Sequence, residues 1–390
     1  MPLAKVAEVD SEGCPLLWET FGMEAVLAIF AAIDDPRDHT ARYELPALLF
    51  LALAATLCGA RSCVDIADFA AANRADLAEI VDLPADATPS HDTFSRLFRL
   101  LDPEQLDAAL RCFAAALRRG LGLGPVEGTV AVDGKRLRRG YERGRAHMPP
   151  LMVGIWDAET RLSLAARTGA DGNEVAATLA ALKTVSLKGC IVTGDALHCH
   201  PGMARQVRAQ GGHYALKLKA NHGPLLAAAQ AAFAAAEAEG VLRWSSTEDD
   251  ANDRNERRCG CVFPVPATAP AFPGLVAFGR IDSMRTKRGG KTESKTQYVV
   301  LSQRLPAWRM LSITRRHWSV ENHLHRQVDV VFREDDARTR KDNAPGNLSV
   351  IRRMALDILR AHPLPRSIAR KMNLARWNRP FFFELFSYVR

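Results

Sequence analysis

The spacing of hydrophobic residues changes near residue 125 and divides the chain into two regions. Before this point apolar residues recur at helical spacing between short turns, which predicts helices at 45–57, 65–83, 90–102 and 103–117. The stretch Leu45–Ala60 carries no charge over 16 residues, too few to cross a membrane, and indicates a buried helix. Antiparallel helices of this kind pack into a small bundle. We therefore expect a separate all-α domain over residues 1–125.

Beyond residue 125, short apolar runs replace the helical pattern and predict strands. Runs at 128–135, 152–158 and 161–167 precede an alternation of helix and strand that continues to residue 219. This order indicates a mixed sheet flanked by helices, an α/β fold. The sequence pattern over residues 240–303 is typical of an inserted β-structure, and two more helices are predicted after it. The expected second domain spans residues 126–362, and a basic tail with an aromatic end follows over 363–390.

Residues 315–335 combine a polar stripe with an apolar one. The polar side chains, spaced by four and so along one side of a helix, are His317, Glu321, His325 and Asp329. The apolar stripe consists of Val320, Leu324, Val328 and Val331. Such a helix buries one face and presents a carboxylate on the other. A solvated face with paired charges is the ordinary alternative. A zinc hydrolase is another, although the chain has no H-E-x-x-H motif.

Two aspartates follow buried apolar runs. Asp133 comes directly after Thr129–Val132, and Asp195 comes after Cys190–Gly194. Each alone is explained by the preference of aspartate for turns after strands. If neighbouring strands bring both beside Glu321, the three carboxylates offer hard oxygen ligands for two Mg²⁺ or Mn²⁺ ions, about 3.5–4 Å apart. Without metal these carboxylates would repel one another and raise one another's pKa.

The net charge of +8 is unevenly distributed along the chain. Residues 1–127 hold 10 Lys+Arg against 20 Asp+Glu, a net charge of −10. Residues 128–303 hold 24 against 16, and residues 304–390 hold 18 against 8. A polyanion such as DNA would therefore meet the middle and the C-terminal third. The helix beginning at Ser90, with Arg96 and Arg99, is either a DNA-reading element or a packing helix.

The cellular setting is indicated by the N-terminus and the cysteines. The N-terminus carries acidic residues in place of the basic and then apolar run of a signal peptide. The eight cysteines are scattered and do not resemble a secreted disulfide framework. The C-x-C at 259–261 lacks a second pair at zinc spacing. These features predict a cytoplasmic protein without a membrane partner.

Several segments, in a fixed order along nearly the whole chain, carry a family resemblance. They are DPRD (35–38), LLFLALAATLCGA (48–60), SHDTFSRLFRLLDP (90–103), AVDGKRLRRG (131–140), NEVAATLAAL (173–182), KGCIVTGDALHCH (188–200), YALKLKANHG (214–223), RRHWSVENHLHRQVDVVFRED (315–335) and RTRKDNAPGNLSVIRRMALDIL (338–359). The chain resembles an insertion-sequence transposase of the DDE class, closest to the branch that contains the H-repeat-associated proteins.

This resemblance implies an RNase H-like catalytic core with a β-rich insertion and an associated helical N-terminal domain. Asp133, Asp195 and Glu321 would be the catalytic residues and would bind two Mg²⁺ or Mn²⁺ ions. The enzyme would cut the terminal inverted repeats of its element in double-stranded DNA, and the freed 3′-hydroxyl would attack target DNA. It would self-associate in a transpososome in the bacterial cytoplasm, at the nucleoid.

Further residues are expected to support these acids or to contact DNA. Those beside Glu321 are His317, Asn322 and His325. The candidates for holding DNA phosphates are Lys135, Arg138, Arg139, Lys217, Lys219 and Asn221. Sister transposases carry a Tyr, Arg, Glu, Lys signature around the last acid, where this chain has Thr314, His317 and Val328 at the other three places. The alternative to an active transposase is an inactivated or domesticated remnant that still binds DNA.

Overall fold

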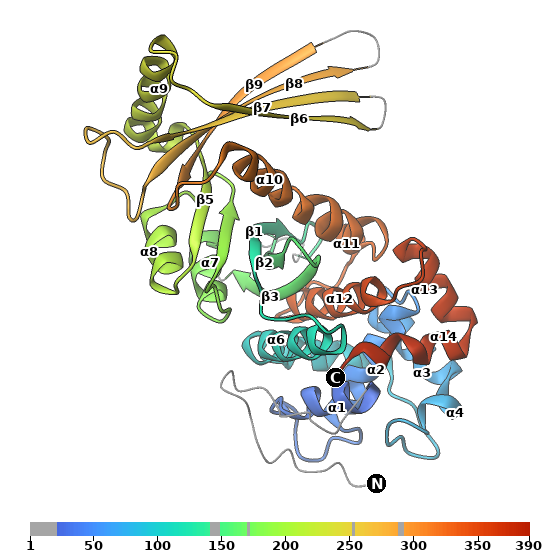
Figure 1. Cartoon of the computed structure of the whole chain (residues 1–390). Coiled ribbons are helices and arrows are strands. Elements are labelled where there is room, and N and C mark those ends of the chain that lie inside the picture. Colours follow the sequence, from blue (N-terminus) through green and yellow to red (C-terminus); the bar gives the residue numbers. More distant parts are fainter. Residues whose placement is uncertain (1–21, 141–148, 170–171, 252–253, 288–291) are drawn as a thin grey trace.

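The computed structural model describes residues 22–140, 149–169, 172–251, 254–287 and 292–390. A mixed sheet of nine strands runs through these residues. Helices gather around one part of this sheet, and four long strands project away from the other part (Figure 1). The chain is therefore an α/β protein whose helical and β-rich parts occupy different ends of the molecule.

The first five strands form the sheet that the resemblance implies. The strands β1 (Gly128–Arg136), β2 (Leu151–Asp157) and β3 (Leu162–Gly169) make an antiparallel meander. The strands β4 (Cys190–Gly194) and β5 (His213–Leu218) follow in parallel with β1, so that the spatial order is β3-β2-β1-β4-β5. This order is that of an RNase H-like core, and the predicted fold class is confirmed.

Two helices cover one face of this core sheet. They are α7 (Glu174–Leu182) and α8 (Pro201–Ala209), and they belong to the predicted alternation of helix and strand. Because side chains alternate along a strand, Val130 and Val132 of β1 point to the same face. Both valines are fully buried and belong to one apolar cluster with Ala181 of α7. This packing fixes which side of β1 faces the other layer.

The opposite face of β1 carries Ala131 and Asp133. Ala131 is buried in a core shared with α12 (Ala344–Ala361). The helix α10 (Ala307–His317) contacts both β1 and β4. Asp133 therefore points toward the helical layer into which α10 leads.

The β-rich insertion follows α9 (Gly223–Ala238). Its strands are β6 (Trp244–Ala251), β7 (Arg254–Pro264), β8 (Ala277–Lys287) and β9 (Thr292–Leu301). They pair antiparallel in sequence, and β9 also pairs with β5, so the insertion extends the core sheet in the order β5-β9-β8-β7-β6. These strands project as two long hairpins (Figure 1). The predicted β-structure over 240–303 is confirmed.

The described residues before the sheet form helices, as predicted. These are α1 (Met23–Ala31), α2 (Leu45–Leu57), α3 (Cys63–Ala72), α4 (Arg74–Leu77), α5 (His91–Leu100) and α6 (Pro103–Gly120). The helix predicted at 65–83 is interrupted at Asn73, whose side chain bonds to the Phe69 carbonyl and ends α3. Their apolar side chains share one continuous core with α12. The helix α5 packs in this core, and its Arg99 pairs with Asp342 at 2.7 Å.

The C-terminal residues, expected as a basic tail, fold into helices instead. They form α13 (Ile368–Trp377), α14 (Arg379–Glu384) and a 3-10 turn at Leu385–Tyr388. The reason is the aromatic content of this segment, because burying such rings stabilises a packed arrangement. Phe386 is 1% exposed, and its ring centroid lies 5.4 Å from that of Phe50 in α2.

The uncharged stretch that begins at Leu45 forms the predicted buried helix. Twelve of the thirteen residues of α2 are buried. Within the part of the chain that the structure describes, no helix is long and apolar enough to cross a membrane. The free thiols among these residues are Cys58, Cys63, Cys190, Cys199, Cys259 and Cys261, whereas Cys112 is disulfide-bonded.

Candidate functional site

The parallel pairing of β1 with β4 places Asp133 and Asp195 side by side. Gly128 pairs with Cys190 and Ala131 with Thr193, an offset of 62 positions (190 − 128). The same offset separates Asp133 from Asp195 (195 − 133). Asp195 follows the last residue of β4, where the ladder ends and the edge of β1 becomes open. The carboxyl ends of neighbouring parallel strands thus deliver both aspartates to one place.

Glu321 reaches this place from a π-helical segment. The predicted helix over 315–335 is not continuous: α10 ends at His317, a π-helix covers Val320–His325, and α11 covers Arg326–Val330. Segments of π-helix are frequent at functional sites. The local widening does not disturb the apolar stripe, whose members Val320, Leu324 and Val328 are at most 1% exposed.

Two contacts hold this π-helical segment against the sheet. The Trp156 indole Nε1–H of β2 donates to Ser319 Oγ at 3.2 Å, just before the segment begins. Leu324 packs over Gly154, where even an added Cβ would lie 3.5 Å from the leucine. Gly154 is also the β2 partner of Asp133. The backbone that carries Glu321 therefore rests directly beside Asp133.

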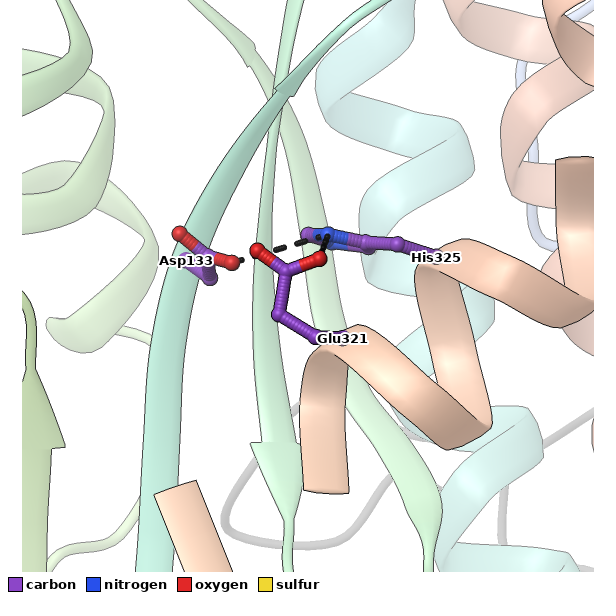
Figure 2. Close-up of side chains that lie close together, drawn as sticks. All are labelled: Asp133, Glu321 and His325. Atoms are coloured by element: carbon purple, nitrogen blue, oxygen red, sulfur yellow. Dashed lines mark ion pairs between the residues drawn. The ribbon is translucent and has the colours of Figure 1, made fainter. Parts of the chain in front are cut away.

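His325 faces both of the carboxylates that the sheet and the π-helix bring together (Figure 2). Its Nδ1 is 3.5 Å from Asp133 Oδ2 and 3.7 Å from Glu321 Oε2. One potential ligand atom from each of these residues lies within 4.8 Å of the others. His325 is 6% exposed, whereas the Glu321 side chain is 53% exposed. The group is thus anchored on its inner side and open to solvent on its outer side.

The two carboxylates of this group differ in pKa because of burial, charge repulsion and the contact with His325. Burial, followed by the Glu321 carboxylate and a smaller contribution from Asp195, raises the pKa of Asp133 to about 8. The hydrogen bond from His325 lowers the pKa of Glu321. Without a cation, one proton is therefore retained on the Asp133–Glu321 pair near neutral pH.

A second group of donor atoms shares Asp133. It contains Glu174 in the first turn of α7 and His198 in the turn after Asp195, and one ligand atom from each of the three lies within 4.8 Å of the others. His198 is 1% exposed, and its Nε2 lies 3.3 Å from Glu174 Oε1. Neither Glu174 nor His198 is among the residues that the sequence pattern predicts for the site. Glu174 follows the helix cap Asn173. In the sequence it is therefore an ordinary acid of a first helical turn and gives no functional signal.

His317, the first member of the predicted polar stripe, lies apart from Glu321 and His325. Its Nδ1 is 3.1 Å from Thr193 Oγ1 of β4. Burial lowers the pKa of His317 to about 4, although Asp195 acts in the opposite direction. His317 belongs to neither metal-ligand group found among the described residues, and these groups contain no cysteine. The arrangement does not supply the two histidines and third ligand that a zinc hydrolase requires.

Comparison with known proteins decides the family. Residues 124–358 match the family model described as Transposase DDE domain, and residues 27–114 match the model described as DDE_Tnp_1-associated. The first match spans more than half of the chain. The chain belongs to the transposase DDE domain family.

Similar proteins occur in Escherichia coli strain K12. The "Putative protein YbfL" is 29% identical over 352 residues, which cover 87% of this chain and 91% of the relative. The "H repeat-associated putative transposase YhhI" is 28% identical over 352 residues with the same coverage. A cryo-EM structure of the piggyBac transposase synaptic complex with hairpin DNA has a TM-score of 0.43 and 11% identity, covering 96% of this chain and 82% of that chain.

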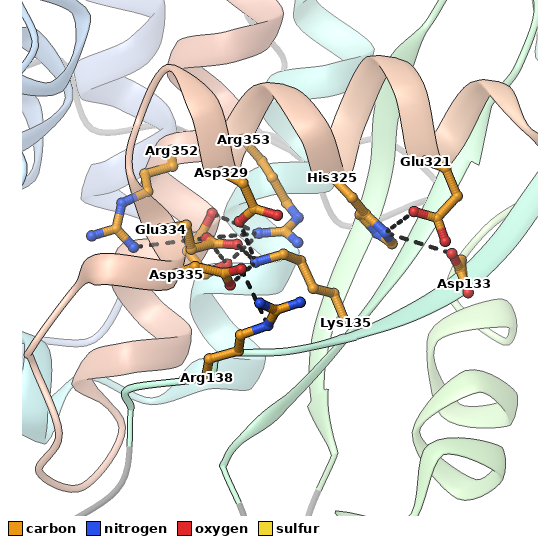
Figure 3. A network of polar contacts seen from close by, with 11 residues as sticks. Asp133, Lys135, Arg138, Glu321, His325, Asp329, Glu334, Asp335, Arg352 and Arg353 are labelled. Carbon is orange, nitrogen blue, oxygen red and sulfur yellow. Dashed lines mark hydrogen bonds and ion pairs between the residues drawn. The ribbon is translucent and has the colours of Figure 1, made fainter.

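In this transposase-family chain, Lys135 is not available to hold a DNA phosphate as expected. Its Nζ lies 2.6 Å from Asp329, 3.1 Å from Glu334 and 2.9 Å from Asp335 (Figure 3). The Lys135 side chain is only 9% exposed. It neutralises buried carboxylates and joins β1 to the segment that follows Glu321, a role that depends on contacts between residues nearly 200 positions apart.

Two arginines of α12 complete this ion cluster on its inner side. Arg352 and Arg353 lie 3.7 Å and 3.6 Å from Glu334 Oε1, and Ser349 Oγ donates to the same oxygen at 2.6 Å. Burial alone would raise the pKa of Glu334, but Arg353, followed by Lys135 and Arg352, lowers it to about 2. The buried carboxylate therefore stays ionised and fixes the chain after α11 against α12.

Other predicted DNA contacts line a cleft beside Asp195. The cleft has a volume of about 690 Å³, and its lining includes Asp195, Lys217, Lys219 and Lys295. Burial, followed by the charges of Lys219 and Lys295, lowers the pKa of Lys217. Asn221 also lines the cleft, but its side-chain amide donates to the Ala196 carbonyl at 2.9 Å. The amide thus orders the loop after Asp195.

Three further residues predicted to support the acids or to contact DNA have exposed side chains. Arg138 has 78% of its side chain exposed and makes a 3.3 Å pair with Asp335 at the rim of the ion cluster. Arg139 is half exposed and lies 3.9 Å from Asp336. Asn322 follows Glu321 on the open side of the π-helix and is exposed. All three side chains are accessible to a ligand.

Proposed function

We propose that this protein is the DNA transposase of an insertion sequence, and that Asp133, Asp195 and Glu321 are its catalytic residues. The observation that carries the proposal is the approach of the Asp133 and Glu321 carboxylates to each other and to His325. Two further features support it: the offset of the β1–β4 ladder assigns Asp195 to the position that matches Asp133, and a cleft lined with lysines lies beside Asp195. Paired divalent ions need clustered hard oxygen donors, and DNA needs a basic surface leading to them.

The donor set fits Mg²⁺ or Mn²⁺. Carboxylate oxygens with a nearby imidazole suit these ions, whereas neither donor group contains a thiolate. The raised pKa of Asp133 supports the same conclusion, because a cation among these groups would relieve the repulsion that now retains a proton. When bound, two such ions activate the attacking oxygen and stabilise the leaving oxygen of a phosphoryl transfer.

The protein's own side chains then position the reacting groups. In the first step, water attacks a phosphodiester at the element end, the P–O bond to the 3′ oxygen breaks, and a free 3′-hydroxyl and a 5′-phosphate remain. In the second step, this 3′-hydroxyl attacks a target phosphodiester and forms a new P–O bond while a target 3′-hydroxyl leaves. Asp133, Asp195 and Glu321 would hold the ions, and His325 would orient Asp133 and Glu321.

DNA would enter along the basic cleft. Lys219 and Lys295 are the exposed cations of its lining, and they would pair with backbone phosphates of the terminal inverted repeats or of target DNA. Both DNA ends must be held while they are joined, so we further propose that copies of the chain associate on DNA. The catalytic domain would span residues 126–362.

The decisive experiment is a strand-cleavage assay with purified full-length protein. The substrate is a labelled duplex of the terminal repeats that flank the gene, incubated with Mg²⁺, with Mn²⁺ or with EDTA. Glu321→Gln serves as the variant, because it removes one carboxylate from the open side of the site. Glu24→Gln is its control, since Glu24 is an exposed acid of α1.

We expect nicking that requires a divalent ion, that the control variant retains and that Glu321→Gln loses. Tight binding to the repeats without cleavage in either metal would instead favour a DNA-binding remnant. Cleavage by Glu321→Gln at the wild-type rate would remove Glu321 from the catalytic group.

A further inference from the structure

We propose that Glu174 and His198 complete the binding place of a second divalent ion, with Asp133 shared between the two ions. This inference rests on the proposed two-metal function and extends its ligand set from three residues to five. One ion would lie beside Asp133 and Glu321, the two carboxylates that His325 orients. The other would lie among Asp133, Asp195 and the Glu174–His198 pair.

The first argument is geometric. Two groups of three residues each have ligand atoms that all lie within 4.8 Å of one another, and both groups contain Asp133. A carboxylate has two oxygens and can bridge two ions, and ions in two-metal sites lie about 3.5–4 Å apart. Glu321 and His325 approach Asp133 from the helical layer after α10, whereas Glu174 comes from α7, which packs on the other face of the sheet. The two groups thus surround Asp133 from opposite sides.

The second argument is that the strands leave room for both side chains. A Cβ at Gly134 would lie 2.5 Å from the Glu174 carboxyl carbon, and a Cβ at Gly194 would lie 2.7 Å from the His198 Cβ. Real side chains do not come this close, so any other residue at these positions would displace the pair. Gly134 follows Asp133 and Gly194 precedes Asp195. The backbone beside each aspartate is therefore bare where Glu174 and His198 approach.

The third argument concerns the unused nitrogen of His198. Its Nε2 is fully buried and makes no hydrogen bond, although Glu174 Oε1 is 3.3 Å away. An unsatisfied buried polar atom costs about 1–3 kcal/mol. A shared cation would bind the lone pair of His198 Nε2 together with the neighbouring carboxylates.

Charge balance agrees with this arrangement. Asp133, Asp195 and Glu321 carry −3 when ionised, and two divalent ions bring +4. Glu174 adds the fourth negative charge and makes the metal-loaded group neutral before DNA binds. A neutral group in a half-buried site avoids the cost of an uncompensated charge.

The test is the number of Mn²⁺ ions that full-length protein binds at pH 8, measured from the electron paramagnetic resonance signal of free Mn²⁺. Wild-type protein should bind two ions per chain, and the bound pair should show spin coupling. Glu174→Gln should bind one ion with unchanged affinity and the second at least tenfold more weakly, without the coupling. Glu24→Gln, which also removes an acid from the first turn of a helix, should behave as wild type.

A second measurement needs no substitution. Fe²⁺ bound in place of Mn²⁺, with ascorbate and peroxide, generates radicals that cut the backbone close to each ion. Cuts near residues 174 and 198, in addition to those near 133 and 321, support the inference. Wild-type Mn²⁺ stoichiometry and coupling in Glu174→Gln, or cuts confined to 133, 195 and 321, overturn it. These outcomes are separate from the strand-cleavage result for Glu321→Gln, on which the proposed function depends.

Discussion

Asp133 of β1 and Asp195, the residue directly after β4, are 62 positions apart, which equals the offset of the β1–β4 ladder. Any slip of this register would separate the carboxylates by a full residue along the strand and turn one of them to the other face. The ladder has only four paired positions, and the last of them lies two residues before each acid. Short parallel pairing therefore determines the geometry of the proposed site.

We predict that Asp195→Asn lowers the strand-cleavage rate at least 10³-fold while DNA affinity changes less than threefold. The amide keeps the volume and the contact with the Leu197 backbone N–H, which now donates to Asp195 Oδ1 at 2.8 Å, but it loses the charge that would hold an ion. Single-turnover cleavage and a filter-binding titration on the same duplex separate the two effects. Cleavage within tenfold of the wild-type rate would show that Asp195 is dispensable.

His325→Gln should reduce the cleavage rate about 10–100-fold and raise the Mn²⁺ concentration needed for half-maximal rate. The imidazole Nδ1 faces both Asp133 and Glu321 and would orient both carboxylates, whereas glutamine cannot reach them with the same rigid geometry. The measurement is the rate as a function of Mn²⁺ concentration. His323→Gln is the matched control, because His323 lies in the same π-helix but in neither donor group. An unchanged Mn²⁺ dependence in His325→Gln would contradict the orienting role.

Lys135→Met should destabilise the fold by about 3–5 kcal/mol, because it leaves buried carboxylates without their cation. Arg138→Ala should change stability by less than about 1 kcal/mol, since its pair with Asp335 is largely exposed. Urea unfolding of both variants measures the difference. The effects on DNA affinity should be reversed: Arg138→Ala should weaken DNA binding more than Lys135→Met does, when only folded protein is compared. A Lys135→Met protein of wild-type stability would restore Lys135 as a candidate phosphate ligand.

Metal-free protein should lose stability as pH rises from about 4 to about 8. The pKa of Asp133 is raised to about 8 in the folded chain, so between these values the folded state holds a proton that the unfolded state has released. The free energy of unfolding therefore falls with pH, by at most about 1.4 kcal/mol per pH unit from this group.

The measurement is denaturant unfolding in EDTA at pH 6, 7, 8 and 9, for wild type and Asp133→Asn. The difference in the free energy of unfolding between the two proteins isolates the contribution of Asp133. This difference should become constant above pH 8. Saturating Mn²⁺ should abolish the decrease in the free energy of unfolding with pH in the wild type, because the ion displaces the proton on Asp133. Parallel pH profiles for both proteins would mean that Asp133 titrates as an ordinary aspartate.

Lys219→Ala should weaken DNA binding and reduce the slope of log affinity against log salt by about 0.9. Lys219 lines the cleft and is exposed, so it can release one counterion when it pairs with a phosphate. Affinities measured at several potassium chloride concentrations give the slope. Lys183→Ala, which removes an exposed lysine at the end of α7, should leave the slope unchanged. Equal slopes for wild type and Lys219→Ala would exclude a phosphate contact at this position.

The elements of the fold could be predicted because their signals are local. Ser90 and Asp102 cap α5 and α6 at the expected places, and the apolar run beginning at Leu45 forms α2. Asp133 and Asp195 stood out because each follows a buried run. Local periodicity does not distinguish a π-helix from an α-helix, so the sequence predicts an ordinary helix around Glu321. The aromatic C-terminus was read as a tail because its packing partners, such as Phe50, are far away in sequence.

The sequence by itself determined the secondary structure, the mixed α/β class and the carboxylates that stand at strand ends, since backbone geometry and side-chain alternation act between near neighbours. Only the tertiary structure decided which distant groups meet. It placed Glu174 and His198 beside Asp133, enclosed Lys135 among acids from after α11, and joined the insertion to β5. The physical reason is that such contacts depend on strand register and layer packing, and neither quantity is encoded in the spacing of residues along one segment.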